Sequence, residues 1–355
     1  MSLQEYNVDI NKIEEWVPWG GLTMPHVLEN KDGSFVAIVQ YDQYPPNPQN
    51  FDLPEFCRGW VVTVEEQHFK NPETLKMESK YFIVFCWNPF KLNSGIIRNT
   101  LNKPVRIENA LKYFGTIVLQ LADRLSKVTK VKVLEYQEIL DFLAFSISFK
   151  PQGPAMPEIP LCIDVLMTQN LEIHFAPNSV RQGKSHFVIY TILGMPDLKK
   201  VFYAFMPLQY RHVKRVLCFN KKQSEKVMKG YSNHWCPKRK YMKNAILGDL
   251  LDGNLLGYYS EYFIFLVPDE YMGQVLSFNE DLNKKKRIGY RLESFNAKDI
   301  WWGSLPGCFR ADIHTPIIGV KDVDELMSHT PEAKKKVVLT DKDTKRQVAV
   351  KGGLF

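Results

Sequence analysis

The order of strand-like and helix-like stretches most constrains the fold of this chain. Runs rich in β-branched and aromatic residues predict strands, and apolar residues recurring every three or four positions predict helices. The two kinds lack the regular alternation of a doubly wound parallel sheet. We therefore expect an α+β fold with antiparallel strands. Asp32-Gly33 predicts a tight turn between the apolar stretch 22–28 and the next strand. Predicted strands cover residues 35–39, 59–69, 80–87, 186–193, 212–220, 262–267 and 287–295, and predicted helices cover residues 105–127, 135–145, 198–205, 222–235, 241–251 and 271–283.

A proline-rich segment, Lys150–Pro160, interrupts this pattern. It contains four prolines and one glycine, residues that break helices and strands. We interpret it as the boundary between two mixed lobes, the first covering residues 1–150 and the second residues 151–315. Residues 316–355 are expected to form a divergent basic tail, because the stretch from Pro331 has seven Lys and Arg against three acidic residues.

Composition narrows the class of protein. Hydrophobic residues make up 45% of the 355 residues and aromatic residues 13%, which is typical of a packed globular protein. The six cysteines include no Cys-x-x-Cys pair, so we expect neither a zinc site nor a disulfide framework. The N-terminal stretch does not resemble a signal peptide, and no apolar run approaches the roughly 18 residues of a membrane span. These features predict a cytoplasmic chain that binds no metal.

Positive charge is concentrated between Gln209 and Lys243, where eleven Lys and Arg face one acidic residue, Glu225. Such a block can bind an anionic membrane, an acidic partner or nucleic acid. Pro237 interrupts it and disfavours a continuous DNA-recognition helix. The alternative interpretation is the solvated face of a helix whose other side is core. The candidate anion-binding residues are Arg211, Lys214, Arg215, Lys238, Arg239 and Lys240.

Gly183-Lys184-Ser185 looks like the end of a phosphate-binding loop. The full pattern needs a glycine five residues earlier, where Asn178 stands, and a helix afterwards, where a strand is predicted. We interpret this stretch as a polar turn before a strand. "WGSLPG" is not a nucleophile elbow either, because Trp302 occupies the position of its first glycine. The sequence therefore predicts no catalytic residue, no cofactor site and no ATP hydrolysis by this chain.

Several stretches, in this order along the chain, resemble the N-terminal region of the CagE/TrbE/VirB family of type IV secretion and conjugal transfer ATPases. The resemblance covers about Trp16 to Pro316, and "IWWGSLPG" matches the Trp-x-Gly-Ser-Leu-Pro-Gly signature that ends this region. The other matching stretches are "VPWGGLTMPHVLENKDGSFVAIVQY", "RGWVVTVEEQHF", "MESKYFIVFCWNPF", "EILDFLAFSISFKPQGPAMPEIPLCIDVLM" and "FMPLQYRHVKRVLCFNKKQSEKVMKGYSNHWCPKRK".

The resemblance implies an assembly and docking module of a bacterial secretion or conjugation machine. In the family, a RecA-like motor with the ATP-binding motifs follows the signature, but this chain ends about fifty residues later. The resemblance therefore leads us to expect a truncated chain, a split gene or an excised domain, with ATP bound only by the full-length family. Trp301, Trp302, Gly303 and Gly307 are the candidates for contact with a motor; core packing is the alternative for the two tryptophans.

The resemblance also implies partners and a location. The expected partners are inner-membrane components of the secretion or conjugation complex, with the chain on the cytoplasmic side and peripheral to the membrane. Self-association is a further expectation, since a motor-contact surface left uncovered is apolar. Two alternative functions stay open: a nucleic-acid-binding module that uses the basic segment, and an ATPase subunit that acts with a motor chain supplied in trans.

Overall fold

The fold is taken from a computed structural model of the chain. The structure describes residues 17–42, 59–89, 103–127, 129–157, 162–169, 171–176, 179–192, 205, 207–219, 256–284, 290–294, 296–308, 317–319, 339–340 and 347–348.

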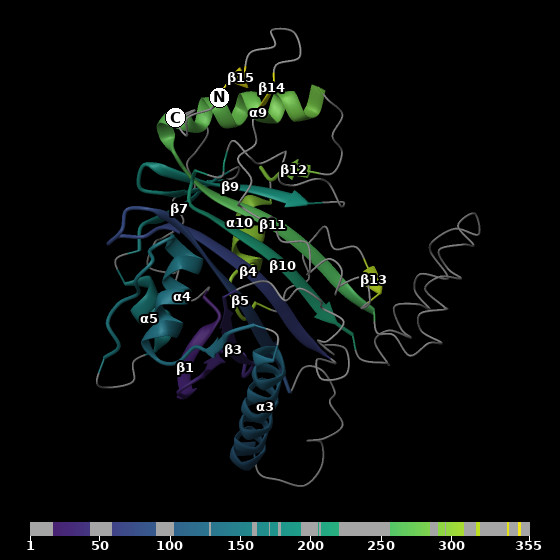
Figure 1. The fold of residues 1–355 in the computed structure, drawn as a ribbon. Helices are drawn as coiled ribbons and strands as arrows, with labels where there is room; N and C mark the ends of the chain where they lie inside the picture. The colour runs from purple at the N-terminus through teal and green to yellow at the C-terminus, as the bar shows by residue number, and fades with distance from the viewer. Residues whose placement is uncertain are drawn as a thin grey trace, which may run out of the picture.

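One large sheet organises the described part of the chain (Figure 1). Its thirteen strands follow the order β1-β2-β3-β5-β4-β10-β11-β9-β8-β7, with β6, β12 and β13 pairing to β3, β9 and β11. Every pairing among these strands is antiparallel. The strands are β1 (Trp19–Met24), β2 (Val27–Asn30), β3 (Phe35–Tyr41), β4 (Trp60–Lys70), β5 (Met77–Trp87), β6 (Val131–Val133), β7 (Ile173–Ala176), β8 (Ser179–Gln182), β9 (Ser185–Ile192), β10 (Tyr210–Cys218), β11 (Leu256–Pro268), β12 (Tyr290–Leu292) and β13 (Ile317–Gly319), and a separate hairpin pairs β14 (Leu339–Thr340) with β15 (Gln347–Val348).

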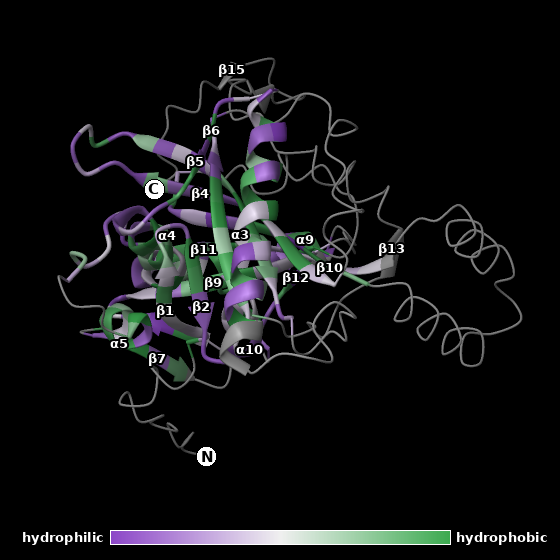
Figure 2. Cartoon of the chain, turned by 90° about the horizontal axis from the view of Figure 1, so that it is seen from below, coloured by the Kyte–Doolittle hydropathy of each residue, from purple (hydrophilic) through white to green (hydrophobic). Residues whose placement is uncertain are grey.

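Helices cover both faces of the sheet. Three of them, α4, α5 and α10, pack on one face, in a core that includes Phe82, Phe142 and Trp301. On the opposite face α3 and α9 lie toward different ends of the sheet (Figure 1). Seen from below, the hydrophobic colouring gathers where strands and helices meet (Figure 2). The helices are α3 (Lys103–Ser126), α4 (Gln137–Ser148), α5 (Ile163–Thr168), α9 (Met272–Lys284) and α10 (Ala297–Gly303), with a 3₁₀ turn η5 (Asp269–Tyr271) before α9.

The helix α3 shows how sequence periodicity places a helix on the sheet. Its buried residues recur at three- and four-residue steps, which gives one apolar side to a long helix. Phe114 is fully buried on that side and contacts the rings of Phe35 and Trp60, with centroids 5.9 and 5.0 Å away. No helix in the described ranges combines the length and the hydropathy needed to cross a membrane.

The predicted α+β class with antiparallel strands is confirmed. The predicted hairpin is also confirmed, with Gly33 at φ 79° in the turn between β2 and β3. Each predicted strand from 35–39 onward has a counterpart, but β11 starts six residues earlier than expected and β12 is only three residues long. The helices expected at 222–235 and 241–251, and nearly all of the one at 198–205, lie outside the described residues.

The sheet crosses the boundary expected at residues 150 and 151. β4 from the first half pairs with β10 from the second along the register from Tyr210↔His68 to Leu217↔Val61. The proline-rich segment packs back on α4: the Gly153 amide donates to Asp141 at 2.8 Å, and Gln137 bonds both Pro154 and Met156. Strands of both expected lobes therefore form one sheet, and residues 150–157 act as a packed connection within it.

Candidate functional site

The basic residues of β10 are buried. Arg211, Lys214 and Arg215 are 0%, 4% and 5% exposed. β10 lies in the middle of the sheet, between β4 and β11, with packed cores on both faces, so a charge on it enters the interior. Their burial corrects the expectation that these three residues lie on an anion-binding surface. The other three candidates, Lys238, Arg239 and Lys240, lie outside the described residues.

The four motor-contact candidates lie in α10 and the turn after it. Trp301 is 3% exposed and packs against Phe175 and Phe187, with ring centroids 5.4 and 5.9 Å away. Gly303 and Gly307 are also buried, whereas Trp302 is half-buried. Trp301 is thus a core residue, and of these four candidates Trp302 alone presents part of its side chain at the surface.

The β10 arginines hold the turn after α10. We call residues 303–308 the Gly303–Cys308 turn. Arg211 Nη2 donates to the Ser304 carbonyl oxygen at 3.0 Å, and Nη1 donates to the Ser304 hydroxyl at 3.3 Å. The Arg215 guanidinium donates to the carbonyl oxygens of Gly303 and Cys308. Two sets of residues that the sequence assigned to different roles therefore form one buried cluster.

Glu65 on β4 neutralises Arg211. Its two carboxylate oxygens accept from Arg211 Nε and Nη2, both at 2.8 Å, and both side chains are 0% exposed. The cluster extends to α4, because Arg211 Nη1 also donates to the Ser146 carbonyl oxygen at 2.8 Å. Gln67 donates to Glu65 at 2.8 Å. A buried ion pair is tolerated when its remaining polar atoms are satisfied, and these contacts provide that.

Two residues at the start of the fold complete the cluster. Trp19 Nε1 donates to the Pro306 carbonyl oxygen at 2.8 Å, and Asn30 Nδ2 donates to the Gly307 carbonyl oxygen at 3.1 Å. Gly307 has φ 88°, and a Cβ atom there would lie 2.6 Å from Asn30 Nδ2. The position therefore requires glycine both for its backbone and for the close approach of Asn30. Sequence reasoning missed Trp19, Asn30 and Glu65, which lie far from the turn in the chain.

A second polar cluster occupies the other face of β4 and β10. Glu66 Oε1 accepts hydrogen bonds from the hydroxyls of Ser79 and Tyr210, both at 2.9 Å. His212 Nε2 lies 2.7 Å from Glu261 Oε1 on β11. Lys214 pairs in register with Glu261 on the adjacent strand. Charged groups of three neighbouring strands are thus gathered at the middle of the sheet.

Burial dominates the electrostatics of this second cluster. It raises the pKa of Glu66, against the lowering effects of the His212 charge and the Ser79 and Tyr210 hydrogen bonds. It lowers the pKa of Lys214. For Glu261, burial also acts upward, but the hydrogen bond and charge of His212, together with Lys214, hold its pKa below the usual range. The cluster therefore favours a protonated carboxyl at Glu66 and an ionised one at Glu261.

Both clusters are suited to positioning chain segments. Their charged residues are buried, with donors and acceptors directed at one another and at main-chain carbonyls. Within the residues that the structure describes, no group of three or more His, Cys, Asp or Glu could hold a metal ion. Gly183 and Lys184 form the tight turn between β8 and β9, with Gly183 at φ 56°. The predicted polar turn before a strand is confirmed there.

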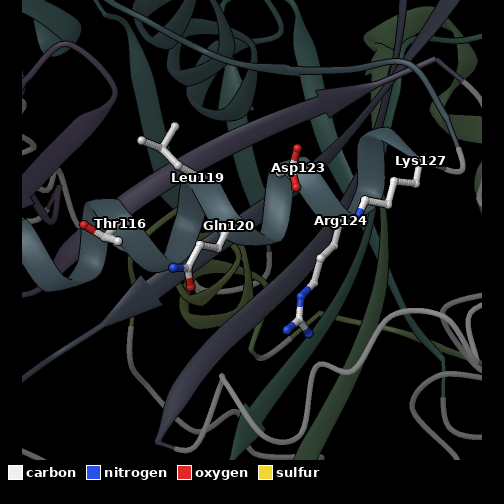
Figure 3. A pocket seen from close by; sticks show the side chains of 6 residues that line it. All are labelled: Thr116, Leu119, Gln120, Asp123, Arg124 and Lys127. Carbon is white, nitrogen blue, oxygen red and sulfur yellow. The ribbon is translucent and has the colours of Figure 1, made fainter.

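A surface groove runs along the outer side of α3 (Figure 3). Its volume is about 580 Å³, and Leu119, 49% exposed, is its apolar residue. Arg124 and Lys127 place positive charge at one end, as the sticks in Figure 3 show. Sequence reasoning missed this groove, although Leu119 lies outside the apolar repeat that defines the buried side of the helix. The lining residues are Thr116, Leu119, Gln120, Asp123, Arg124 and Lys127.

No protein-family model matches the chain. Among curated proteins, it is 21% identical to the "Conjugal transfer protein TrbE" of Rhizobium radiobacter, in an alignment that covers 92% of this chain and 50% of that protein. It is 23% identical to a probable conjugal transfer protein TrbE of Sinorhizobium fredii (strain NBRC 101917 / NGR234), over 55% of this chain and 33% of that protein. The chain thus spans half the length or less of these curated relatives. They confirm the resemblance to the CagE/TrbE/VirB family.

Removal of Glu65 should destabilise the protein strongly. Glu65→Gln leaves the Arg211 charge buried without a counter-charge, and we expect the free energy of unfolding to fall by about 3–5 kcal/mol. Glu65→Gln combined with Arg211→Met should cost less than the sum of the two single changes, because they act on one pair. Urea unfolding followed by circular dichroism measures these values. The control is Lys112→Gln, which breaks an exposed ion pair with Glu108 and should cost less than about 1 kcal/mol; an equal loss in Glu65→Gln and Lys112→Gln would contradict the prediction.

Glu66 should make stability fall as pH rises. Because burial raises its folded-state pKa above the usual range of a glutamate, the folded state binds the proton more tightly than the unfolded state, and stability is lost as pH rises through the folded-state pKa. Glu66→Gln should therefore gain stability relative to wild type from about pH 5 to about pH 8. Glu78→Gln serves as the control of opposite sign, since the hydrogen bond from Asn71 lowers the Glu78 pKa. A wild-type-to-Glu66→Gln difference that stays constant with pH in urea titrations would refute the assignment.

Proposed function

We propose that the chain is an assembly and docking module of a bacterial conjugal transfer or type IV secretion system, equivalent to the N-terminal part of its ATP-hydrolysing motor. The observation that carries the proposal is the alignment of 92% of this chain with half of a conjugal transfer protein. The order of the matching stretches supports it, since it runs from the β1–β3 region to the Gly303–Cys308 turn.

The fold suits a rigid platform. A single sheet joins residues from Trp19 to Gly319, and the Gly303–Cys308 turn is anchored on its centre. Trp302 is half-buried next to this anchored turn, which supports it as part of a contact surface, since tryptophan is enriched at the centres of interfaces. We therefore place the contact with a motor near Trp302, with Trp301, Gly303 and Gly307 as the buried support beneath it.

We assign ATP binding and hydrolysis in such a machine to a motor domain or a separate motor chain. The β8–β9 turn supports this division of labour, because a strand follows Gly183-Lys184 where a phosphate site needs a helix N-terminus. We further propose that the chain acts on the cytoplasmic side of the inner membrane, in contact with the membrane components of the transfer complex. Attachment would then be peripheral and electrostatic, through Lys238, Arg239 and Lys240.

A mating assay tests the role in transfer. In a donor strain with the coding sequence deleted in frame, we expect plasmid transfer to fall to the level of a donor without transfer genes. The wild-type gene should restore transfer, and Lys184→Ala should restore it equally, because the β8–β9 turn is not a nucleotide site. Unchanged transfer in the deletion strain would refute the proposed function, and failure of Lys184→Ala with normal protein levels would refute the interpretation of the turn.

A sedimentation assay with vesicles tests peripheral attachment. Each lysine near an anionic surface contributes about 1 kcal/mol, so Lys238→Glu/Arg239→Glu/Lys240→Glu should weaken binding to phosphatidylserine vesicles by at least about a hundredfold at low salt. The control, Lys127→Glu/Lys130→Glu/Lys284→Glu, changes the same charge at exposed positions and should bind more tightly than the triple variant. Equal binding by all three proteins, or tight binding to single-stranded DNA without vesicle binding, would contradict the membrane proposal and favour a nucleic-acid module.

A further inference from the structure

The Gly303–Cys308 turn is attached to the sheet almost entirely through its own carbonyl oxygens. Five of them accept hydrogen bonds from side chains of β1, β2 and β10. Together they form a cradle of N–H donors around a short main-chain segment. The donors are Trp19 to Pro306, Asn30 to Gly307, Arg211 to Ser304, and Arg215 to both Gly303 and Cys308.

The backbone hydrogen bonds of the turn are local. The amides of Ser304, Leu305 and Cys308 donate to Ile300, Trp302 and Leu305, at 2.8, 3.0 and 3.1 Å. In the described part of the chain, no strand pairing includes a residue of the turn. The ladders between β4, β10 and β11 therefore do not depend on the turn being in place.

The charges of the cradle are arranged so that the sheet tolerates loss of the turn. Arg211 keeps its two-point contact with Glu65, which comes from β4 and not from the turn. The Trp19 and Asn30 donors can bond water when the carbonyls leave, since exchange of a protein partner for water has a small net cost. Segments held in this way open at lower free energy than the ladders of the core.

We infer that the Gly303–Cys308 turn is a latch, which opens as a unit from the arginines of β10 while the sheet stays folded. Trp302 lies directly before the latch, so a partner that contacts Trp302 shifts the balance between the closed and open states if it binds one of them more tightly. Opening also uncovers Cys308, which is 8% exposed, and Cys86, whose Sγ atom lies 3.8 Å from the Gly307 carbonyl oxygen. The latch is a property of this chain alone and does not require the proposed docking function.

Thiol labelling of the full-length protein tests the latch. N-ethylmaleimide is added in native buffer with low concentrations of urea, and mass spectrometry follows Cys308 and Cys218, each rate being divided by the rate in the unfolded protein. Cys218 is 3% exposed in β10 and reports opening of the sheet. We expect Cys308 to react at least about tenfold faster than Cys218, with a weaker dependence on urea.

Two variants weaken the latch by different amounts. Trp19→Phe keeps an aromatic ring but removes one N–H donor, and should speed Cys308 labelling by about three- to tenfold with Cys218 unchanged. Arg215→Lys loses the two-point contact and should speed it by more than about tenfold. The control Arg181→Lys alters an exposed ion pair with Asp269 and should change neither rate. If Arg215→Lys fails to fold, Trp19→Phe decides. Equal normalised rates and equal urea dependence for Cys308 and Cys218, or equal acceleration of both in Trp19→Phe, would overturn the inference.

Discussion

The ion pair between Arg211 and Glu65 is the interaction on which the rest of the described structure depends. Arg211 is fully buried in the central strand of the sheet. Its guanidinium reaches the adjacent strand through Glu65, the helix layer through the Ser146 carbonyl, and the turn after α10 through Ser304. One planar group with five donors thus joins segments from both halves of the chain, which a flexible single-point cation such as lysine would not do equally well.

The register of β4 against β10 follows from the same charges. Glu65 and Glu66 are consecutive, so their side chains point to opposite faces of the sheet. The register pairs Glu66 with His212 and Gln67 with Arg211, so each carboxylate meets a basic partner on its own face. A slip by one residue would turn Arg211 toward the face that His212 now occupies and leave Glu65 without its partner. The cost of unpaired buried charge makes that arrangement unfavourable, so the two clusters specify the register as well as stabilise it.

Much of the fold could be predicted from the sequence, because hydrophobic periodicity is local. The helix α3 and the hairpin at Asp32-Gly33 are clear in the sequence and match the structure. The burial of Arg211, Lys214 and Arg215 could not be predicted from charge density, since charge alone does not tell a central strand from an exposed helix face. The adjacent Glu65-Glu66 pair within a predicted strand was the available signal that buried acidic partners exist. The Trp19 and Asn30 contacts with the turn span 287 and 277 residues, and no local pattern encodes them.

The structure also explains most letters of the Trp-Trp-Gly-Ser-Leu-Pro-Gly stretch in physical terms. Trp301 and Leu305 fill the core between α10 and the sheet, and the Ser304 hydroxyl donates to the Trp301 carbonyl oxygen at 2.6 Å while accepting from Arg211. Gly307 is required by its positive φ and by Asn30. Trp302 is different, because packing against the core accounts for only part of its surface. A large aromatic residue kept half-exposed beside an otherwise fully anchored turn is better explained by a contact with another molecule than by the stability of this fold.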